Sequence, residues 1–513
     1  MHKQIEQLHD AELALIIDYV KNVHEKYYVE LKKSRELPSS FWETYSSFSN
    51  TSGGLIILGV EEASPENIIH GVQNPNKIIT ELWNHVSNKQ KASIRNIDNG
   101  DIQTIDVDEN RQIIFIFVKE LPESAKPLYI NNKKDNVYIR TGDGDRKATN
   151  DELQAFYRNS NPVQDSLFVE HATLNDLDPR SIANFQSIVS SRNDKNHFED
   201  MSPKDFLTKV GACGIDRADG KWKIKYGTLL FLGKHNAIKD FFPHYHLDYF
   251  NRRGNNPRWI DRISDDEISD YEMNIFNFFN LTIAKLQAIL QDSFRLDENQ
   301  IRIPKSNFDE TLRECLANCL CHADYTQGYP SLKIEVYDGW FKFSNPGKML
   351  VSRQQFFNGG DSRPRNETIM KLFRLIGVSE RQGFGGQLIY RSAVENHYRL
   401  PEVTTNIEKT EVIVWNIDLV DSYPDLSEHD KNVLKYAMKH TGFFTVNDIC
   451  DDLGISKYQA LKSIHSLKSR ELLTQYGKAR STQYGVSVGT PEMITHLQIM
   501  LDFLRKNISE MHI

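Results

Sequence analysis

Residues 308–325, FDETLRECLANCLCHADY, carry groups that could do chemistry on one face of a predicted helix. Apolar side chains recur at i, i+3, i+4, i+7 and i+8, which is typical of an amphipathic helix with one buried stripe: Leu312, Cys315, Leu316, Cys319 and Leu320. Glu314 and Asn318 lie on the opposite face with Cys321, and His322 is beside them. This face therefore lines up a carboxylate, an amide and an imidazole where an ordinary surface helix carries Lys and Glu. The alternative is a buried amphipathic helix without chemistry.

The segments that follow predict the elements that position these groups. Residues 332–349 alternate like two strands with a turn at Asp338-Gly339, and they include Asn345-Pro346-Gly347. Two further pieces are SRPRNETI, with Arg365 and Asn366, and SERQGFGGQ at residues 379–387. Because glycines let a backbone approach phosphate groups, a phosphate-binding turn is expected at Gly383, Gly385 and Gly386.

In this order the pieces resemble the divergent ATPase module of the gyrase, heat-shock chaperone, histidine kinase and mismatch-repair superfamily. The resemblance implies ATP and Mg²⁺ as cofactors, with Glu314 as the general base for water and Asn318 as the Mg²⁺ ligand. It also implies cofactor-binding residues at His322, Asn345, Gly347, Arg365, Asn366, Gly383, Gly385 and Gly386.

Two positions depart from that superfamily's pattern. Asn345-Pro346-Gly347 stands where the superfamily has Asp-x-Gly-x-Gly, whose Asp binds the adenine amino group. His322-Ala323-Asp324-Tyr325 stands where the divergent subgroup has His-Arg-Asp-Tyr, so one basic residue is missing beside the expected phosphate site.

Length and composition limit the class of protein that this chain can be. A chain of 513 residues with 39% hydrophobic and 26% charged residues is expected to form several globular domains. The net charge of −8 gives no global nucleic-acid signature, so such binding has to come from local patches. Five cysteines, an odd number, favour reduced thiols and a cytoplasmic location. No long apolar run predicts a membrane span, the N-terminus does not have the pattern of a signal peptide, and no P-loop motif occurs.

Residues 23–150 predict a second block, in which LIILGV is a buried central strand. The block resembles the divergent AlbA domain of the Schlafen family. The pieces that carry the resemblance are VELK at 29–32, FSNTSGG at 48–54, GVEE at 59–62 and YIRTG at 138–142. In bacterial members this domain is generally taken to bind DNA. The basic residues available for phosphate contacts are Lys32, Lys33 and Arg140, together with Arg35, Lys89, Lys91, Arg95, Arg146 and Lys147.

Some Schlafen members instead cut structured RNA with three carboxylates and a divalent metal. Glu25, Glu30 and Glu62 stand at the matching places, with Glu62 where the family more often has Asp. Clustered carboxylates that hold Mg²⁺ or Mn²⁺ can activate water. The structural alternative is that Glu30 orders the sheet by pairing with Lys32 or Arg140, while Glu25 is solvated.

Residues 160–300 predict an α/β connector. KYGTLLFLGK and HYHLDYFNRR are predicted strands, and residues 265–291 a long helix. His244 and His246 are interpreted as sheet residues because no acidic partner is evident from the sequence.

Residues 425–488 predict three helices and a two-stranded wing, an order that resembles a winged helix-turn-helix. Between 453 and 484 there are six basic residues against one acid, Glu471, which contrasts with the acidic whole. The third helix would enter the major groove. DNA contacts are expected at Ser456, Lys457, Lys462, Lys478 and Arg480.

Together these patterns predict an α/β multidomain protein. Its expected parts are an N-terminal helix (1–22), a Schlafen AlbA-like domain (23–158), a connector (159–300), a two-layer ATPase-like sandwich (301–420), a winged helix (425–488) and a C-terminal helix (489–513). The expected function is nucleotide-responsive binding of double-stranded DNA by a transcriptional regulator, as a dimer, with weak ATPase activity and RNA as another ligand. The alternative function is a metal-dependent nuclease.

Overall fold

The computed structural model divides the chain into two compact units, residues 1–162 and 163–513. It describes residues 10–25, 28–33, 36–89, 91–108, 111–160, 163–192, 198–254, 258–267, 270–292, 308–360, 363–378, 383–440, 442–477, 481–488, 490, 492–493 and 497. The chain has a mixed α/β fold with several sheets, which confirms the predicted fold class.

The first unit is built on a four-stranded sheet in the order β1-β2-β6-β5, with β1 parallel to β2 and the other neighbours antiparallel. The strands are β1 (Val29–Lys32), β2 (Gly54–Leu58), β5 (Ile102–Asp108) and β6 (Arg111–Val118). Ile56 and Leu58 of β2 enter the core shared with α2 (Phe41–Asn50) and α3 (Pro75–Ser87), whereas Ile57 enters a smaller core on the other face. The apolar run is therefore buried on both faces, as its sequence predicts.

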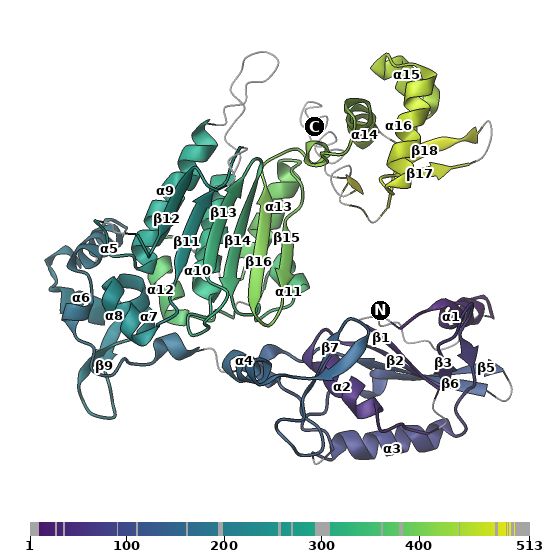
Figure 1. Ribbon diagram of the computed structural model, residues 1–513, viewed down its shortest axis with the longest axis horizontal. Helices are drawn as coiled ribbons and strands as arrows, with labels where there is room; N and C mark the ends of the chain where they lie inside the picture. The colour runs from purple at the N-terminus through teal and green to yellow at the C-terminus, as the bar shows by residue number, and fades with distance from the viewer. Residues whose placement is uncertain are drawn as a thin grey trace, which may run out of the picture. The chain divides into compact units, whose positions relative to one another are not determined.

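Shorter elements complete this unit (Figure 1). They are α1 (Asp10–Asn22), the pair β3 (Val60–Glu61) and β4 (Ile68–Ile69), the pair β7 (Tyr138–Thr141) and β8 (Gly144–Lys147), and α4 (Asn150–Ser160). Gly53 has a φ of +69°, and a Cβ there would lie 2.8 Å from the carbonyl oxygen of Val118, so the turn into β2 requires glycine.

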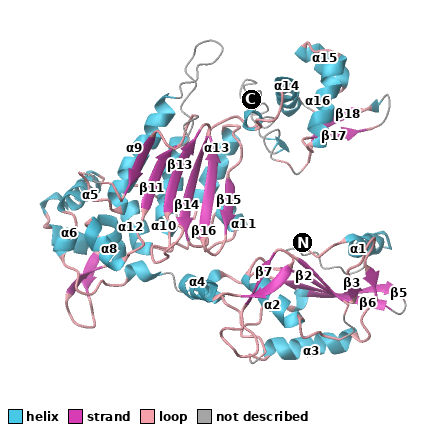
Figure 2. Ribbon diagram, in the orientation of Figure 1, coloured by secondary structure: helices cyan, strands magenta, loops and turns pink. Residues whose placement is uncertain are grey.

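The second unit contains a six-stranded sheet in the order β12-β11-β13-β14-β16-β15, in which only β11 and β13 are parallel. The strands are β11 (Leu247–Asn251), β12 (Asp261–Ser264), β13 (Leu332–Tyr337), β14 (Trp340–Pro346), β15 (Glu402–Thr405) and β16 (Lys409–Trp415). The helices α9 (Ile275–Asp292), α10 (Phe308–His322) and α13 (Gly385–Glu395) lie together on one face of this sheet (Figures 1 and 2).

The sheet crosses the boundary that the sequence placed near residue 300. β11 and β12 precede that boundary, yet β11 pairs with β13 beyond it. Parallel pairing joins strands that are far apart in the chain, and no local pattern of side chains records it. The connector and the ATPase-like segment therefore share one sheet.

Two predicted elements of the connector were wrong. Residues 226–232, predicted as a strand, form α7 (Tyr226–Leu232), and the helix predicted from residue 265 begins only at Ile275. Most residues of α7 are fully buried, so its short apolar run has no polar face to distinguish a helix from a strand. The other elements here are α5 (Pro179–Ser191), α6 (Pro203–Lys209), β9 (Cys213–Ile215), β10 (Trp222–Ile224) and α8 (His235–Phe241).

Three helices and an antiparallel strand pair follow, in the order that the sequence predicts: α14 (Glu428–Lys439), α15 (Val446–Leu453), α16 (Lys457–Ser469), β17 (Leu473–Tyr476) and β18 (Gln483–Val486). Gly454 ends α15 in the left-handed conformation, and Ser456 caps α16 two residues later. The predicted C-terminal helix lies almost entirely outside the described residues, as do residues 1–9 of the N-terminal helix.

His246 has the acidic partners that the sequence did not reveal. Its Nε2 lies 2.8 Å from Asp248 and its Nδ1 lies 2.6 Å from Asp265. These two carboxylates raise the pKa of His246 to about 10, so the ring is an imidazolium at neutral pH. Lys239 also pairs with Asp265, at 3.1 Å. With Asp266, these groups could in principle hold a metal ion, but cationic side chains already balance the carboxylates.

We predict that His246→Gln lowers the free energy of unfolding by about 1–3 kcal/mol, because it leaves a buried carboxylate with weaker donors. The folded pKa lies above the ordinary value of 6.5, so the stabilisation is complete below that pH and is lost as the pH rises towards about 10. Urea unfolding of both proteins between pH 6 and pH 10 tests this. A wild-type stability that does not fall relative to the variant over this range would contradict it.

Candidate functional site

α10 carries the polar face that the sequence singled out. Its apolar stripe is buried in the main core, while Glu314 and Asn318 are half-buried. The Nδ2 of Asn318 donates a hydrogen bond of 3.1 Å to Oε1 of Glu314, so the two predicted functional side chains lie in direct contact.

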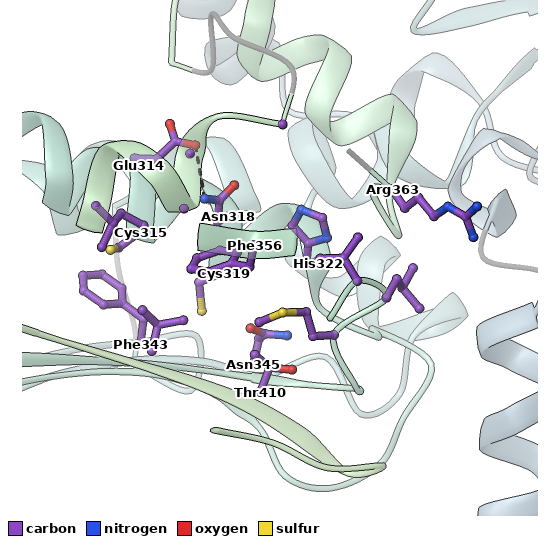
Figure 3. Close-up of a pocket in the computed structure, with 18 of the residues that line it drawn as sticks. Glu314, Cys315, Asn318, Cys319, His322, Phe343, Asn345, Phe356, Arg363 and Thr410 are labelled. Atoms are coloured by element: carbon purple, nitrogen blue, oxygen red, sulfur yellow. Dashed lines mark hydrogen bonds between the residues drawn. The ribbon is translucent and has the colours of Figure 1, made fainter. Parts of the chain in front are cut away.

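This pair lines a cavity between α10, the sheet and three further helices (Figure 3). The cavity encloses about 1000 Å³, including the part open to solvent. Besides α10 and α13, it is bounded by α11 (Arg353–Asn358), α12 (Glu367–Leu375) and the ends of β14 and β16. Seven of the predicted residues line it: Glu314, Asn318, His322, Asn345, Gly383, Gly385 and Gly386.

The start of α13 approaches α10 without an intervening side chain. A Cβ on Gly385 would collide with the carboxylate of Glu314 and lie 2.8 Å from Nδ2 of Asn318. A Cβ on Gly386 would collide with the backbone carbonyl of Phe356. The first N–H groups of a helix have no partners within it, so this approach places a site with partial positive charge beside Glu314 and Asn318. Such a site favours phosphate groups.

Burial sets the protonation of the polar side chains. It raises the pKa of Glu314, which makes the carboxylate a better proton acceptor. Burial, and then the charge of Arg365, lower the pKa of His322 to about 4, so this ring is neutral at pH 7. A neutral imidazole can donate or accept a hydrogen bond but adds no positive charge.

The rest of the wall divides into an apolar part and a cationic part. The apolar side chains are Phe343, Met349, Leu350, Val351, Phe356, Met370, Ile389 and Val412, and the cationic ones are Lys348, Arg363 and Arg374. Asn345 and Thr410 extend into the cavity from the sheet (Figure 3). A planar apolar ring with hydrogen-bonding edges suits the apolar part, and an anionic group suits the cations.

Three of the predicted cofactor-binding residues, Gly347, Arg365 and Asn366, are not in this wall. Arg365 donates to the carbonyls of His322 (3.2 Å) and Lys348 (2.9 Å). Nδ2 of Asn366 donates to the carbonyls of Cys321 (2.9 Å) and Ala323 (2.8 Å). Gly347 has a φ of +93°, and a Cβ there would lie 3.1 Å from Arg365. These residues hold the end of α10 in place.

Sequence reasoning missed the cationic wall and Thr410. Lys348, Arg363 and Arg374 come from three separate segments. The signal available in the sequence was only that basic residues flank the Asn-Pro-Gly and Arg-Asn motifs, and it does not indicate which of them face the cavity.

The three glutamates of the first unit lie near one another, and each side chain accepts from a donor of its own. Glu30 is buried and forms ion pairs with Lys32 and with Arg140 (2.8 Å), the structural alternative given by the sequence. Oε1 of Glu25 accepts from the backbone N–H of Leu31 at 3.1 Å, and Oε1 of Glu62 accepts from that of Glu25 at 3.0 Å. Burial and then Glu30 raise the pKa of Glu25.

The three glutamates do not form a group whose carboxylate oxygens all lie within 4.8 Å of one another. Among the described residues, His246, Asp265 and Asp266 do form such a group of three candidate metal ligands, with atoms within 4.8 Å of one another. All five cysteines are free thiols, and four of them are buried.

The predicted nucleic-acid contacts differ in exposure. In the first unit, Arg140 is buried between Glu30 and Asp145, and the exposed Lys33 pairs with Glu61 at 2.8 Å. Arg146 pairs with Glu152, Lys147 with Asp135, and Lys91 and Arg95 lie over the rings of Trp42 and Trp83. On α16, Ser456, Lys457 and Lys462 are exposed. Arg35, Lys478 and Arg480 lie outside the described residues.

Three family models match separate segments of the chain. Residues 25–149 match "Schlafen, AlbA_2", residues 154–248 match a domain of unknown function, DUF8451, and residues 330–414 match "Putative ATP-dependent DNA helicase recG C-terminal". The Schlafen AlbA segment expected from sequence is therefore found, and an ATPase-like segment follows it. Among curated proteins, none matches.

One solved structure with a match is that of the DIP2311 protein from Corynebacterium diphtheriae. It is 14% identical, and the match covers 93% of this chain and 99% of that one with a TM-score of 0.37. That TM-score is too low to establish a shared fold. No helix in the described parts of the chain is long and apolar enough to span a membrane.

We predict that Asn366→Ala lowers the free energy of unfolding by about 1–3 kcal/mol, because the carbonyl of Ala323 loses its side-chain donor and that of Cys321 keeps only the backbone N–H of residue 366. Asn366→Asp keeps the shape but replaces the donor with an acceptor, so it should destabilise at least as much. Urea titration at pH 7 measures both variants. Wild-type stability in either one would show that Asn366 does not hold α10.

Proposed function

We propose that this protein is a nucleotide-responsive DNA-binding protein in which the cavity beside α10 binds ATP with Mg²⁺. The observation that carries the proposal is the contact of Glu314 with Asn318 in the cavity wall, directly against the glycine start of α13. The match of residues 330–414 to a helicase C-terminal model with an ATP-dependent description supports it.

The two parts of the cavity suit the two ends of a nucleotide. The apolar side chains, with Asn345 and Thr410 at the sheet, would hold the base. An Asn can accept a hydrogen bond from an amino group but can also donate one, so the identity of the base depends on how Asn345 is oriented. In the present arrangement its Nδ2 donates to the carbonyl of Pro346 at 3.2 Å, which leaves Oδ1 as the acceptor for a base amino group.

The other end would hold phosphates and Mg²⁺. The amide oxygen of Asn318 is a ligand of the kind that Mg²⁺ accepts, and the N-terminus of α13 would stabilise the negative charge. Glu314, with its raised pKa, would take a proton from the attacking water. Metal and phosphate charge would compete with the hydrogen bond that now joins Asn318 to Glu314.

The DNA-binding part of the proposal is a winged helix formed by residues 425–488. Lys457 and Lys462 are exposed on α16, beside Tyr458, which is 76% exposed. Exposed cations and an aromatic ring on one helix suit phosphate and base-edge contacts in the major groove. The basic residues between 453 and 484 strengthen the local positive charge in a chain of net charge −8.

A nuclease activity of the first unit is not favoured. Glu30 would have to leave Lys32 and Arg140 to ligate a metal, and breaking such a buried pair strongly destabilises a protein.

We predict that Asn318→Ala loses Mg²⁺-dependent ATP binding, while Glu314→Gln keeps binding and loses hydrolysis by at least about a hundredfold, since it removes only the base. Isothermal titration calorimetry and phosphate release test this. Ser191→Ala, on the exposed end of α5, is the control. Absence of binding by the wild type at millimolar ATP, ADP or GTP would refute the proposed site.

We predict that Lys457→Gln and Lys462→Gln weaken binding of double-stranded DNA by a similar factor for all sequences. The slope of the logarithm of the binding constant against the logarithm of the salt concentration should become shallower by about 0.9 for each lost phosphate contact. Fluorescence anisotropy at several salt concentrations measures this. Lys439→Gln, on the exposed end of α14, is a matched control for charge. An equal loss of DNA affinity in all three variants would contradict the prediction, because it would reflect only the change in net charge.

A further inference from the structure

Three cations gather where the DUF8451 segment meets α12. Lys225 precedes α7, and its Nζ donates to the carbonyl of Gly211 at 3.0 Å. Lys371 of α12 reaches the same glycine, where a Cβ would collide with its Nζ. Arg374 follows one turn later on α12, so it lies beside Lys371 on the helix surface.

In the described portions of the chain, no carboxylate forms an ion pair with Lys225, Lys371 or Arg374. Burial, and then the charges of Lys225 and Arg374, lower the pKa of Lys371, so both cations lie close enough to act on this lysine. Like charges held together in this way are destabilising, and an anion between them would relieve the repulsion.

One member of the cluster, Arg374, lines the cavity, whereas Lys225 and Lys371 are not among its lining residues. Asn366, before α12, bonds to the end of α10, whereas Gly377, after α12, accepts from Arg313 near the start of α10 at 3.3 Å. The two helices therefore run antiparallel. At 1.5 Å per residue, Arg374 lies alongside the first half of α10, and it lines the cavity.

We propose that Lys225, Lys371 and Arg374 bind the terminal phosphate of the nucleotide held in the cavity. The proposal rests on the proposed nucleotide binding and adds which part of the ligand is recognised. The apolar wall and Asn345 would hold the base, and the phosphates would extend past Asn318 to Arg374, which lines the cavity, and on to the two lysines, which lie beyond its lining. A triphosphate reaches this cluster, and a shorter diphosphate loses the contact with the lysines.

The same cluster would connect the cavity to the DUF8451 segment. Asp165, from that segment, is buried, and its Oδ2 accepts from the N–H of Ile369 at 3.0 Å at the start of α12. Gly227 of α7 packs so closely that a Cβ would lie 2.7 Å from Cβ of Thr368. These contacts fix the start of α12 to the DUF8451 segment. A phosphate that draws Lys225 towards Arg374 would therefore tighten the packing of this segment against the second half of α12.

The test compares ATP, ADP and AMP binding, with Mg²⁺, by isothermal titration calorimetry on the full chain. Lys225→Gln and Lys371→Gln should each weaken ATP binding by about tenfold and leave ADP and AMP within about twofold of the wild type. Lys221→Gln, an exposed lysine between β9 and β10, should change none of the three. Equal weakening of ATP and ADP, or wild-type ATP affinity in both variants, would overturn the proposal.

A second measurement separates ligand binding from a structural role. Without nucleotide, both variants should keep or raise the melting temperature of the wild type, because one of the mutually repelling charges is removed. A lower melting temperature would indicate that the lysines support the fold and would overturn the proposal. Inorganic tripolyphosphate should raise the melting temperature of the wild type more than that of either variant.

These experiments distinguish failure of this inference from failure of the proposed nucleotide binding. If the wild type binds no nucleotide, the proposed function fails with the inference. If it binds ATP and ADP equally and the variants do not change this, only the inference fails. If the variants lose affinity for DNA but not for ATP, the cluster serves a nucleic-acid backbone, and the assignment to the nucleotide is overturned.

Discussion

The close approach of α13 to α10 is the constraint on which the candidate site depends. Gly385 and Gly386 allow the start of α13 to pass directly beside Glu314 and the carbonyl of Phe356. Any side chain at these two positions would separate the helices and move the helix N-terminus away from the carboxylate and the amide. The electrostatic effect of a helix terminus falls off within about one turn, so the close contact here determines the charge environment of Glu314 and Asn318.

The buried end of α10 depends on a second set of contacts that involve no ligand. Arg365 and Asn366 donate to the carbonyls of His322, Cys321 and Ala323, all near the last turn of the helix. The last carbonyls of a helix have no partners within it, so these donors satisfy groups that would otherwise be buried without hydrogen bonds. Arg-Asn is thus part of the scaffold of the cavity, and the cationic wall is formed by other residues.

In the first unit, the same types of residue that could form a metal centre form an ion-pair network. Glu30 lies between Lys32 and Arg140, and Arg140 also pairs with Asp145 and lies over the ring of Phe48. The carboxylates of Glu30 and Asp145 balance the two cations, so Glu30 has little tendency to attract a divalent metal. The Asn50 side chain has a comparable structural role, because it both donates to and accepts from the backbone of Leu128.

The sequence by itself determined the elements with strong local patterns. The helical periodicity of α10, the apolar run of β2, and the order of α14, α15, α16 and the strand pair β17–β18 are fixed by neighbouring residues. For the same reason, the spacing of Glu314 and Asn318 along the chain is enough to assign both to one helix face. Local patterns failed where a segment is buried on all sides, as in α7, whose seven residues offer no polar face.

Only the tertiary structure decided which distant groups meet. It joined β11 to β13, placed His246 between Asp248 and Asp265, and brought Lys225 to the lysine and arginine of α12. It also assigned Arg365 to the scaffold and Arg374 to the cavity. Spacing along a chain determines which side chains share a face of one helix or strand, but the distance between two elements depends on packing. Charges and hydrogen-bonding groups acquire their roles from that distance.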